Sequence, residues 1–206
     1  LGILERTDRV WASDTNDALE RQHIQRWTGL LVPPELMGSH VGPPRAHTTG
    51  RSADLAFRTT TALFAHAGLE WDITTCTFDE VAQLRRWAEL YKELRPLIHH
   101  GITVRADHPD DGTWLHGVVS ADRREALFAY VRVDTTADSR PARLLFPGLD
   151  PDMVYTIARR DETGPSRFTP QWLFGTSATG AVLATIGLPA PFLDPQQAVL
   201  LHLTAT

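Results

Sequence analysis

The sequence has few of the features that mark several common classes of protein. Its 206 residues include one cysteine, Cys76, which excludes an internal disulfide framework and is typical of a reducing compartment. No apolar run reaches the roughly 18–20 residues that a membrane-spanning helix requires. The formal net charge of −5 argues against nucleic acid or an anionic membrane surface as the main partner. We therefore expect a cytoplasmic protein that binds neither membrane nor nucleic acid.

Motifs of several reaction classes are also absent. The sequence contains no Gly-rich phosphate loop and no Gly-x-Ser-x-Gly nucleophile motif. Its nine histidines lack both cysteine partners and His-Glu-x-x-His spacing, so no metal site is predicted. The chain begins with Leu rather than Met, and its first residues carry charge too early for a signal peptide. We interpret this start as lying inside a larger fold.

The first half of the chain alternates strand and helix signals. Three short apolar runs are typical of buried parallel strands: Arg9–Ser13, Leu36–Val41 and Leu69–Ile73. Helix candidates follow at about 16–31 and 53–67, and a third begins at the capping-box pattern Thr77-x-x-Glu80. Three βα units are too few to close a barrel, but they fit part of an eight-stranded one. We assign them to residues 1–101.

Residues 102–206 have a different pattern, in which turn-formers separate short strand-like runs. The runs are Ile102–Ala106, Trp114–Ser120, Ala126–Val133, Ala142–Phe146, Val154–Arg159, Ala181–Ile186 and Ala198–Thr204. Seven such runs in about a hundred residues predict an antiparallel β-sandwich. The predicted fold class is therefore α/β followed by all-β.

The segment at residues 9–21 is the most informative part of the chain. It places Asp14 and Asp17 where a strand stops and a helix starts. In βα-repeat folds this end of the sheet carries the chemistry. On the pattern alone, however, a helix cap is the commoner role for either aspartate.

The stretch Val-Trp-Ala-Ser-Asp-Thr-Asn-Asp-Ala-Leu-Glu-Arg at residues 10–21 resembles a segment of family 36 glycoside hydrolases, the α-galactosidases. Three further stretches match in order: Pro34–Val41, His47–Arg51 and Gly68–Ile73. The resemblance implies the last three βα units of a TIM (β/α)8 barrel, followed by an all-β domain. It also implies retaining hydrolysis of terminal α-galactosides such as raffinose-type sugars, without a cofactor, in a parent enzyme that is a homo-oligomer.

The family's general acid/base matches Asp14. This carboxyl must be protonated before attack and ionised afterwards, so its pKa is expected near neutrality. The family's nucleophile is the Asp of a Lys-Trp-Asp segment, which this sequence lacks and which the resemblance places upstream. The 206 residues alone are therefore expected to be inactive.

Three more residues are candidates for substrate binding beside Asp14. Trp11 either shields the site or packs in the barrel core, and core packing is favoured. Asp17 is expected one turn into the helix, where it stabilises the N-terminus or orients a sugar hydroxyl. His40 ends the second strand, where it bonds a sugar, holds a neighbouring carboxylate or is structural.

Other polar residues near this segment are expected to be structural. Glu20 and Arg21 are interpreted as an exposed or inter-helix pair. Arg51 is expected to bridge to other loops or to pair with Asp54. Asp72 is expected to share a strand face with Glu70, yet we treat it as structural because the resemblance places the nucleophile elsewhere.

Three alternative functions remain open on the sequence. In the first, the parent enzyme transfers galactose to an acceptor sugar instead of hydrolysing the substrate. In the second, the parent enzyme has lost its activity. The third alternative is a non-catalytic carbohydrate-binding module that uses exposed aromatic residues of the β-rich half, for example Trp114, Tyr130 or Trp172.

Overall fold

A computed structural model describes residues 2–136, 141–162 and 174–206 of the chain. The described residues form two compact units, the first ending at His99 and the second beginning at His100. Within these ranges no helix is both long and apolar enough to cross a bilayer.

The first unit is built on short parallel strands. Strand β1 (Gly38–Val41) pairs with β2 (His66–Leu69), from Gly38 opposite His66 to Val41 opposite Leu69. On the other edge of β1, Val10 forms a parallel bridge with Met37. Three parallel segments therefore lie side by side, as the βα pattern predicts, although the first is only a single bridge.

Three helices follow these segments and begin at polar caps. Their bounds are α1 Ala18–Thr28, α2 Leu55–Leu63 and α3 Phe78–His100, and short 3-10 turns occupy Gly2–Glu5 (η1), Pro34–Leu36 (η2) and Ile73–Thr75 (η3). Asp17 and Asp54 accept hydrogen bonds at the starts of α1 and α2. The predicted capping box is confirmed, because the Glu80 amide donates to Thr77 Oγ1 and the Thr77 amide donates to the Glu80 carboxylate.

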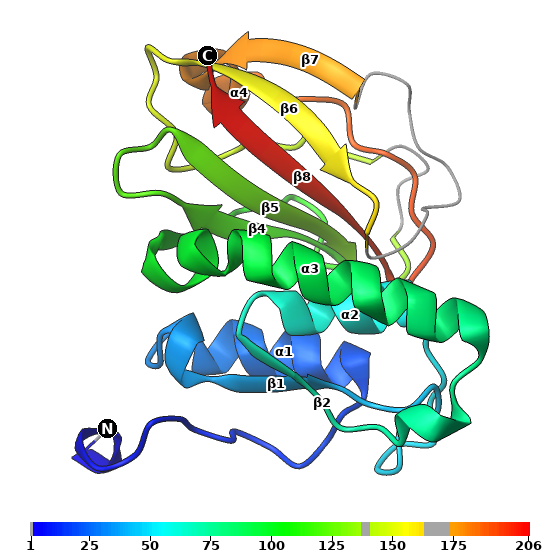
Figure 1. The fold of residues 1–206 in the computed structure, drawn as a ribbon. Helices are drawn as coiled ribbons and strands as arrows, with labels where there is room; N and C mark the ends of the chain where they lie inside the picture. Colours follow the sequence, from blue (N-terminus) through cyan, green and yellow to red (C-terminus); the bar gives the residue numbers. More distant parts are fainter. Residues whose placement is uncertain (1, 137–140, 163–173) are drawn as a thin grey trace. The chain divides into compact units, whose positions relative to one another are not determined.

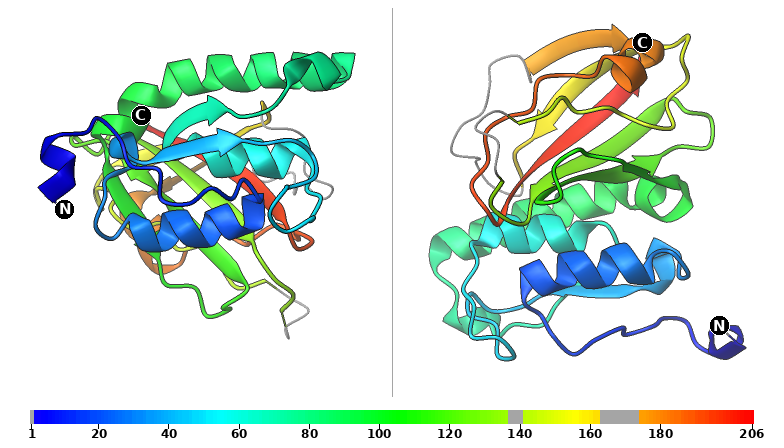
Figure 2. Two further views of the ribbon diagram at one scale, coloured as in Figure 1. Left: turned by 90° about the horizontal axis from the view of Figure 1, so that it is seen from below. Right: turned by 180° about the vertical axis from the view of Figure 1, so that it is seen from behind.

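Helices α1 and α2 pack on one face of β1 and β2 (Figures 1 and 2). Polar contacts then join α3 to this layer. Trp87 Nε1 on α3 donates to the Thr59 carbonyl on α2 at 3.0 Å, and the Tyr91 hydroxyl accepts from the Ala67 amide on β2 at 3.2 Å.

The second unit contains one antiparallel sheet of six strands in the order β3-β4-β5-β8-β6-β7 (Figure 1). The strands are β3 Ile102–Ala106, β4 Thr113–Val119, β5 Glu125–Arg132, β6 Val154–Arg160, β7 Phe174–Thr179 and β8 Gln197–Ala205. The last strand, β8, lies between β5 and β6 and so joins the two halves of the sheet.

The predicted β-sandwich is wrong for the described residues, which form one sheet rather than two. Residues 181–185 of the predicted strand Ala181–Ile186 belong to a helix, α4 (Gly180–Thr185), which Thr179 caps by accepting from the Val182 amide. Residues 142–146 contribute one bridge, between Leu144 and Leu188. Buried side chains of these segments, including Phe146 and Leu183, pack in the core of the unit where a second sheet was expected.

Candidate active site

The strand-to-helix segment that carries Asp14 lies between the Val10 bridge and helix α1. Asp14 is exposed, and its Oδ1 accepts a hydrogen bond from Trp11 Nε1 at 3.1 Å. The donor and the acceptor are only three residues apart, so the turn itself brings them together.

Trp11 is not buried core, contrary to the favoured prediction. It is 38% exposed, and its ring lies 4.5 Å from the His40 ring between centroids. The guanidinium carbon of Arg21 lies 4.2 Å from the centroid of the same indole. We call Trp11, Asp14, Arg21 and His40 the Trp11 cluster.

Two glycines on the parallel strands make room for the rings of this cluster. A Cβ at Gly38 on β1 would lie 2.9 Å from the Trp11 ring, and a Cβ at Gly68 on β2 would lie 2.7 Å from the His40 ring. Real Cβ atoms avoid such distances because of steric repulsion. Both aromatic rings therefore rest directly on the backbone of the sheet.

Arg21 is almost fully buried, at 1% exposure, and does not form the predicted pair with Glu20. It donates to the carbonyl oxygen of Ser13, the residue before Asp14. Burial lowers the pKa of the guanidinium, and the carboxylates of Glu70 and Asp14 partly oppose that shift. A buried cation therefore interacts with the candidate acid/base.

His40 holds a neighbouring carboxylate, which is one of its three predicted roles. Its Nδ1 lies 3.1 Å from Glu70 Oε2. The pKa of Glu70 is lowered, first by a hydrogen bond with the Asn16 side chain and then by the bond with His40, while burial opposes the shift. Asn16 and Glu70 thus connect the start of α1 with the end of β2.

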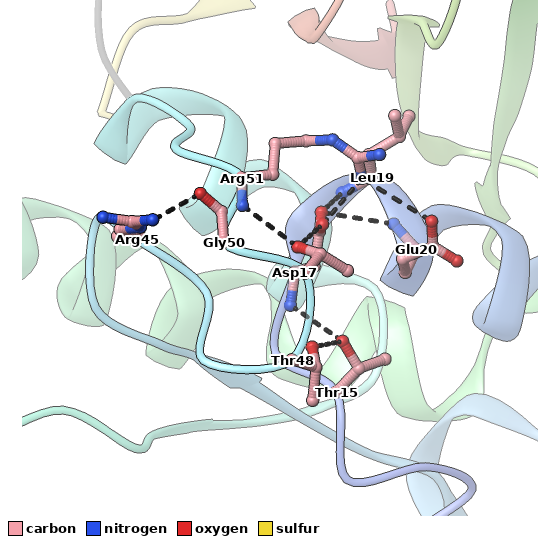
Figure 3. A network of polar contacts seen from close by, with 9 residues as sticks. Thr15, Asp17, Leu19, Glu20, Arg45, Thr48, Gly50 and Arg51 are labelled. Atoms are coloured by element: carbon pink, nitrogen blue, oxygen red, sulfur yellow. Dashed lines mark hydrogen bonds and ion pairs between the residues drawn. The ribbon is translucent and has the colours of Figure 1, made fainter.

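Asp17 is the N-cap of α1, not a residue inside the helix (Figure 3). Its side chain is 1% exposed, and one oxygen accepts from the amides of Leu19 and Glu20. The other oxygen accepts from Thr49 Oγ1 and from Arg51 Nη1, the latter at 2.6 Å. This geometry favours the structural alternative for Asp17, since protein donors occupy both oxygens.

These contacts fasten the loop after β1 to the start of α1. The pKa of Asp17 is lowered although burial would raise it, because the Thr49, Arg51 and Leu19 donors together outweigh burial. Arg51 pairs with Asp17 and lies 3.5 Å from Glu20, so it bridges to another segment, which is the first of its two predicted roles, and does not take Asp54 as its partner.

Two further contacts involve the same loop. The hydroxyls of Thr15 and Thr48 are 2.6 Å apart (Figure 3). Arg45 Nε donates to the carbonyl of Gly50, which has φ +72°. The loop is therefore shaped by its own contacts and held at two points to the segment that bears Asp14.

Comparison with known proteins bears on the whole chain. Residues 1–101 match the family model of Melibiase, and residues 113–203 match that of the glycosyl hydrolase family 36 C-terminal domain. An α-galactosidase of Escherichia coli is 43% identical over 211 residues, which cover 98% of this chain and 30% of that protein. The chain belongs to glycoside hydrolase family 36.

Two further similarities concern α-galactosidase AgaA of Geobacillus stearothermophilus. It is 37% identical over 159 residues, which cover 76% of this chain and 22% of AgaA. The crystal structure of an AgaA variant in complex with raffinose matches with a TM-score of 0.87 at 30% identity, over all of this chain and 27% of that one. This family 36 chain therefore spans less than a third of the length of these relatives.

Two further candidates, Glu70 and Asp72, follow strand β2. Strand β2 ends at Leu69, so Glu70 and Asp72 do not alternate along a strand as expected. Asp72 is exposed and caps η3 by accepting from the Thr74 amide, which agrees with a structural role. No group of three or more potential metal ligands occurs among the residues that the structure describes.

The aromatic residues proposed for a carbohydrate-binding module do not form an exposed surface. Trp114 and Tyr130 are buried. Trp172 lies outside the described residues. The described part of the second unit thus gives no support to binding through these residues.

The sequence pattern did not predict the observed contacts of Arg21, Asn16 and Glu70. Asn16 is buried next to the Asp17 cap and bonds to Glu70, a pairing over more than fifty positions. A weak signal for Arg21 was its place one turn into α1, on the face that follows Asp17 and Ala18, both buried.

Proposed function

We propose that this chain forms part of a retaining α-galactosidase and supplies its general acid/base, Asp14. The observation that carries the proposal is the placement of Asp14, an exposed carboxyl at the carboxyl end of a parallel segment. The matching relatives are named α-galactosidases, which supports the reaction class.

Retaining hydrolysis needs two carboxyl groups on opposite sides of the scissile bond. In the first step, the nucleophile attacks the anomeric carbon and the glycosidic C–O bond breaks, while protonated Asp14 gives its proton to the departing oxygen, so that the aglycone leaves as an alcohol. In the second step, ionised Asp14 takes a proton from water, and the resulting hydroxide displaces the nucleophile from the sugar. Asp14 returns to its protonated form, so the cycle closes without a cofactor.

The hydrogen bond from Trp11 gives the two oxygens of Asp14 different tasks. The indole N–H can only donate, and it holds Oδ1. Oδ2 then carries the transferred proton. The loop held by Asp17 and Arg51 fixes the segment on the other side of Asp14.

The second carboxyl is the proposed Asp of a Lys-Trp-Asp segment. These 206 residues contain no such segment, and they span 30% of the Escherichia coli relative. We therefore place residues 1–101 in a catalytic (β/α)8 barrel and residues 102–206 in a C-terminal domain of a full-length enzyme. The 206 residues alone are expected to be inactive.

The proposed substrates are oligosaccharides with a terminal α-galactosyl residue, such as raffinose-type sugars. AgaA has been solved with raffinose, and a second AgaA variant with stachyose. We propose hydrolysis as the main reaction of a homo-oligomeric enzyme, and transfer of galactose to an acceptor sugar as the alternative.

The test removes Asp14 from the full-length enzyme. We expect Asp14→Asn to lower kcat/KM for raffinose by about 10²–10⁴-fold, the contribution of a positioned general acid. The loss for a dinitrophenyl α-galactoside should be much smaller, because this leaving group departs without a proton. Asp72→Asn removes an exposed carboxylate that caps η3 and should leave both rates near normal.

Two results would contradict the proposal. Near-normal raffinose hydrolysis by Asp14→Asn would reduce Asp14 to a structural role. Absence of α-galactosidase activity in the unsubstituted full-length enzyme would contradict the proposed reaction.

A further inference from the structure

We propose that Arg21 is a positioning residue that holds Trp11 and the Ser13 carbonyl in place for proton transfer by Asp14. This inference rests on the proposed function of Asp14. Nothing in the resemblance assigns a role to Arg21, and the pattern of the sequence predicts only an exposed or inter-helix pair with Glu20.

Arg21 reaches Asp14 by two independent routes. Its guanidinium stacks on the indole of Trp11, whose N–H donates to Asp14 Oδ1. It also donates to the carbonyl of Ser13, which is bonded to the Asp14 amide nitrogen. One side chain therefore restrains both the hydrogen-bond donor of the carboxyl and the backbone that bears it.

The burial of Arg21 argues that the position is specific. A buried charge is costly unless it is well paired, and arginines are rarely buried completely. At 1% exposure, Arg21 leaves Nε and Nη1 without a hydrogen-bond partner among the described residues. Its electrostatic partners are the carboxylates of Glu70 and Asp14.

The planar guanidinium fits this task better than an ammonium group. It stacks face to face on an aromatic ring and donates in its own plane at the same time. Without it, the 38%-exposed indole loses its support on one side, and its N–H is free to turn away from Asp14. The consequence falls on the step that needs a proton, not on folding alone.

The chain offers a matched control in Arg58. This residue is also buried, at 4% exposure, and its guanidinium carbon lies 4.7 Å from the centroid of the Trp71 ring. It also donates to a backbone carbonyl, that of Gly42, at 2.6 Å. Arg58 thus repeats the burial, the stacking and the carbonyl bond of Arg21 without contact with Asp14 or Trp11.

The experiment compares two substrates in the full-length enzyme. For each variant, kcat/KM is measured for raffinose and for dinitrophenyl α-galactoside, and the first is divided by the second. The concentration of folded enzyme cancels in this ratio. We expect Arg21→Met to lower it about 10- to 100-fold, the size of effect that misplacement of a reacting group produces. Arg21→Lys should restore part of the ratio, and Arg58→Met should leave it unchanged.

Trp11→Phe tests the route through the indole, because it keeps an aromatic ring and removes the donor. It should lower the ratio by itself, and adding Arg21→Met should cause less than the product of the two single effects. If Arg21→Met yields no folded enzyme, Arg21→Lys and Trp11→Phe still measure the same ratio.

The outcomes separate this inference from the proposed function. An unchanged ratio in Arg21→Met and Arg21→Lys, with Asp14→Asn lowering it, overturns the role of Arg21 alone. An unchanged ratio in Asp14→Asn overturns the proposed acid/base and the inference with it.

Discussion

Replacing Asp17 by alanine is expected to lower the free energy of unfolding by about 2–4 kcal/mol. The loss of the α1 cap accounts for about 1 kcal/mol of this. Charge-assisted hydrogen bonds contribute about 1.5–3 kcal/mol where the acceptor is buried, as Asp17 is, with its side chain 1% exposed. We reduce the upper end of the hydrogen-bond contribution because the Arg51 side chain is 33% exposed and solvent screens its attraction to Asp17.

Two variants separate the cap from the ion pair. Asp17→Asn keeps an oxygen for the Leu19 amide and should cost about 1–2 kcal/mol. Glu20→Gln removes a carboxylate that is half exposed and 3.5 Å from Arg51, so it should cost less than about 0.5 kcal/mol. A double-mutant cycle of Asp17→Asn with Arg51→Met should give a coupling free energy of about 1 kcal/mol.

The assay is urea denaturation of the full-length enzyme and its variants, followed by tryptophan fluorescence. An Asp17→Ala variant within about 0.5 kcal/mol of the unsubstituted enzyme would refute the reasoning, and so would fully additive single effects in the cycle. Acid provides a second check. The folded pKa of Asp17 is lowered, so its contribution is complete above the unfolded value of about 3.9 and is lost as pH falls through the lower folded pKa. The difference between Asp17→Asn and the unsubstituted enzyme should therefore shrink below about pH 4.

Other predictions concern both units. Tyr155→Phe should lower the free energy of unfolding by about 1–2 kcal/mol, because its buried hydroxyl bonds to two backbone groups. Tyr130→Phe should be neutral or stabilising, because its buried hydroxyl has no partner among the described residues and burial raises its pKa to about 12. Urea denaturation compares the two variants. Gly117→Ala should lower the melting temperature by several degrees, because a Cβ there would overlap a neighbouring backbone carbonyl oxygen. The isolated 206-residue chain should associate in light scattering, since Trp27 and Leu31 are 63% and 71% exposed, and a clean monomer would contradict this.

Short sequence patterns predicted the helices and strands whose boundaries are set by residues within the same segment. The Thr77–Glu80 capping box lies within one turn and marks the start of α3. The predicted strand Ala198–Thr204 lies within β8, Gln197–Ala205. In both cases the residues that determine the structure are close together in the sequence.

The remaining features depend on residues far apart in the sequence or on ambiguous apolar runs. Residues 181–186 are apolar and short, so strand and helix are equally compatible with them until the Thr179 cap is considered. The burial of Arg21 depends on how α1 lies against Trp11, and the pairing of His40 with Glu70 depends on the register of β1 and β2. The sequence therefore placed Asp14 at a strand end but not the cluster that supports it.

The central claim is that Asp14 is the acid/base of a retaining enzyme, and azide rescue of Asp14→Ala in the full-length enzyme tests it most directly. Azide attacks the glycosyl-enzyme without needing a general base, so it bypasses the step that the variant lacks. We expect azide to raise the rate of Asp14→Ala on dinitrophenyl α-galactoside, but not that of the unsubstituted enzyme, and to yield α-galactosyl azide. A β-galactosyl azide product, or no rescue of a variant that has lost activity, would contradict the account.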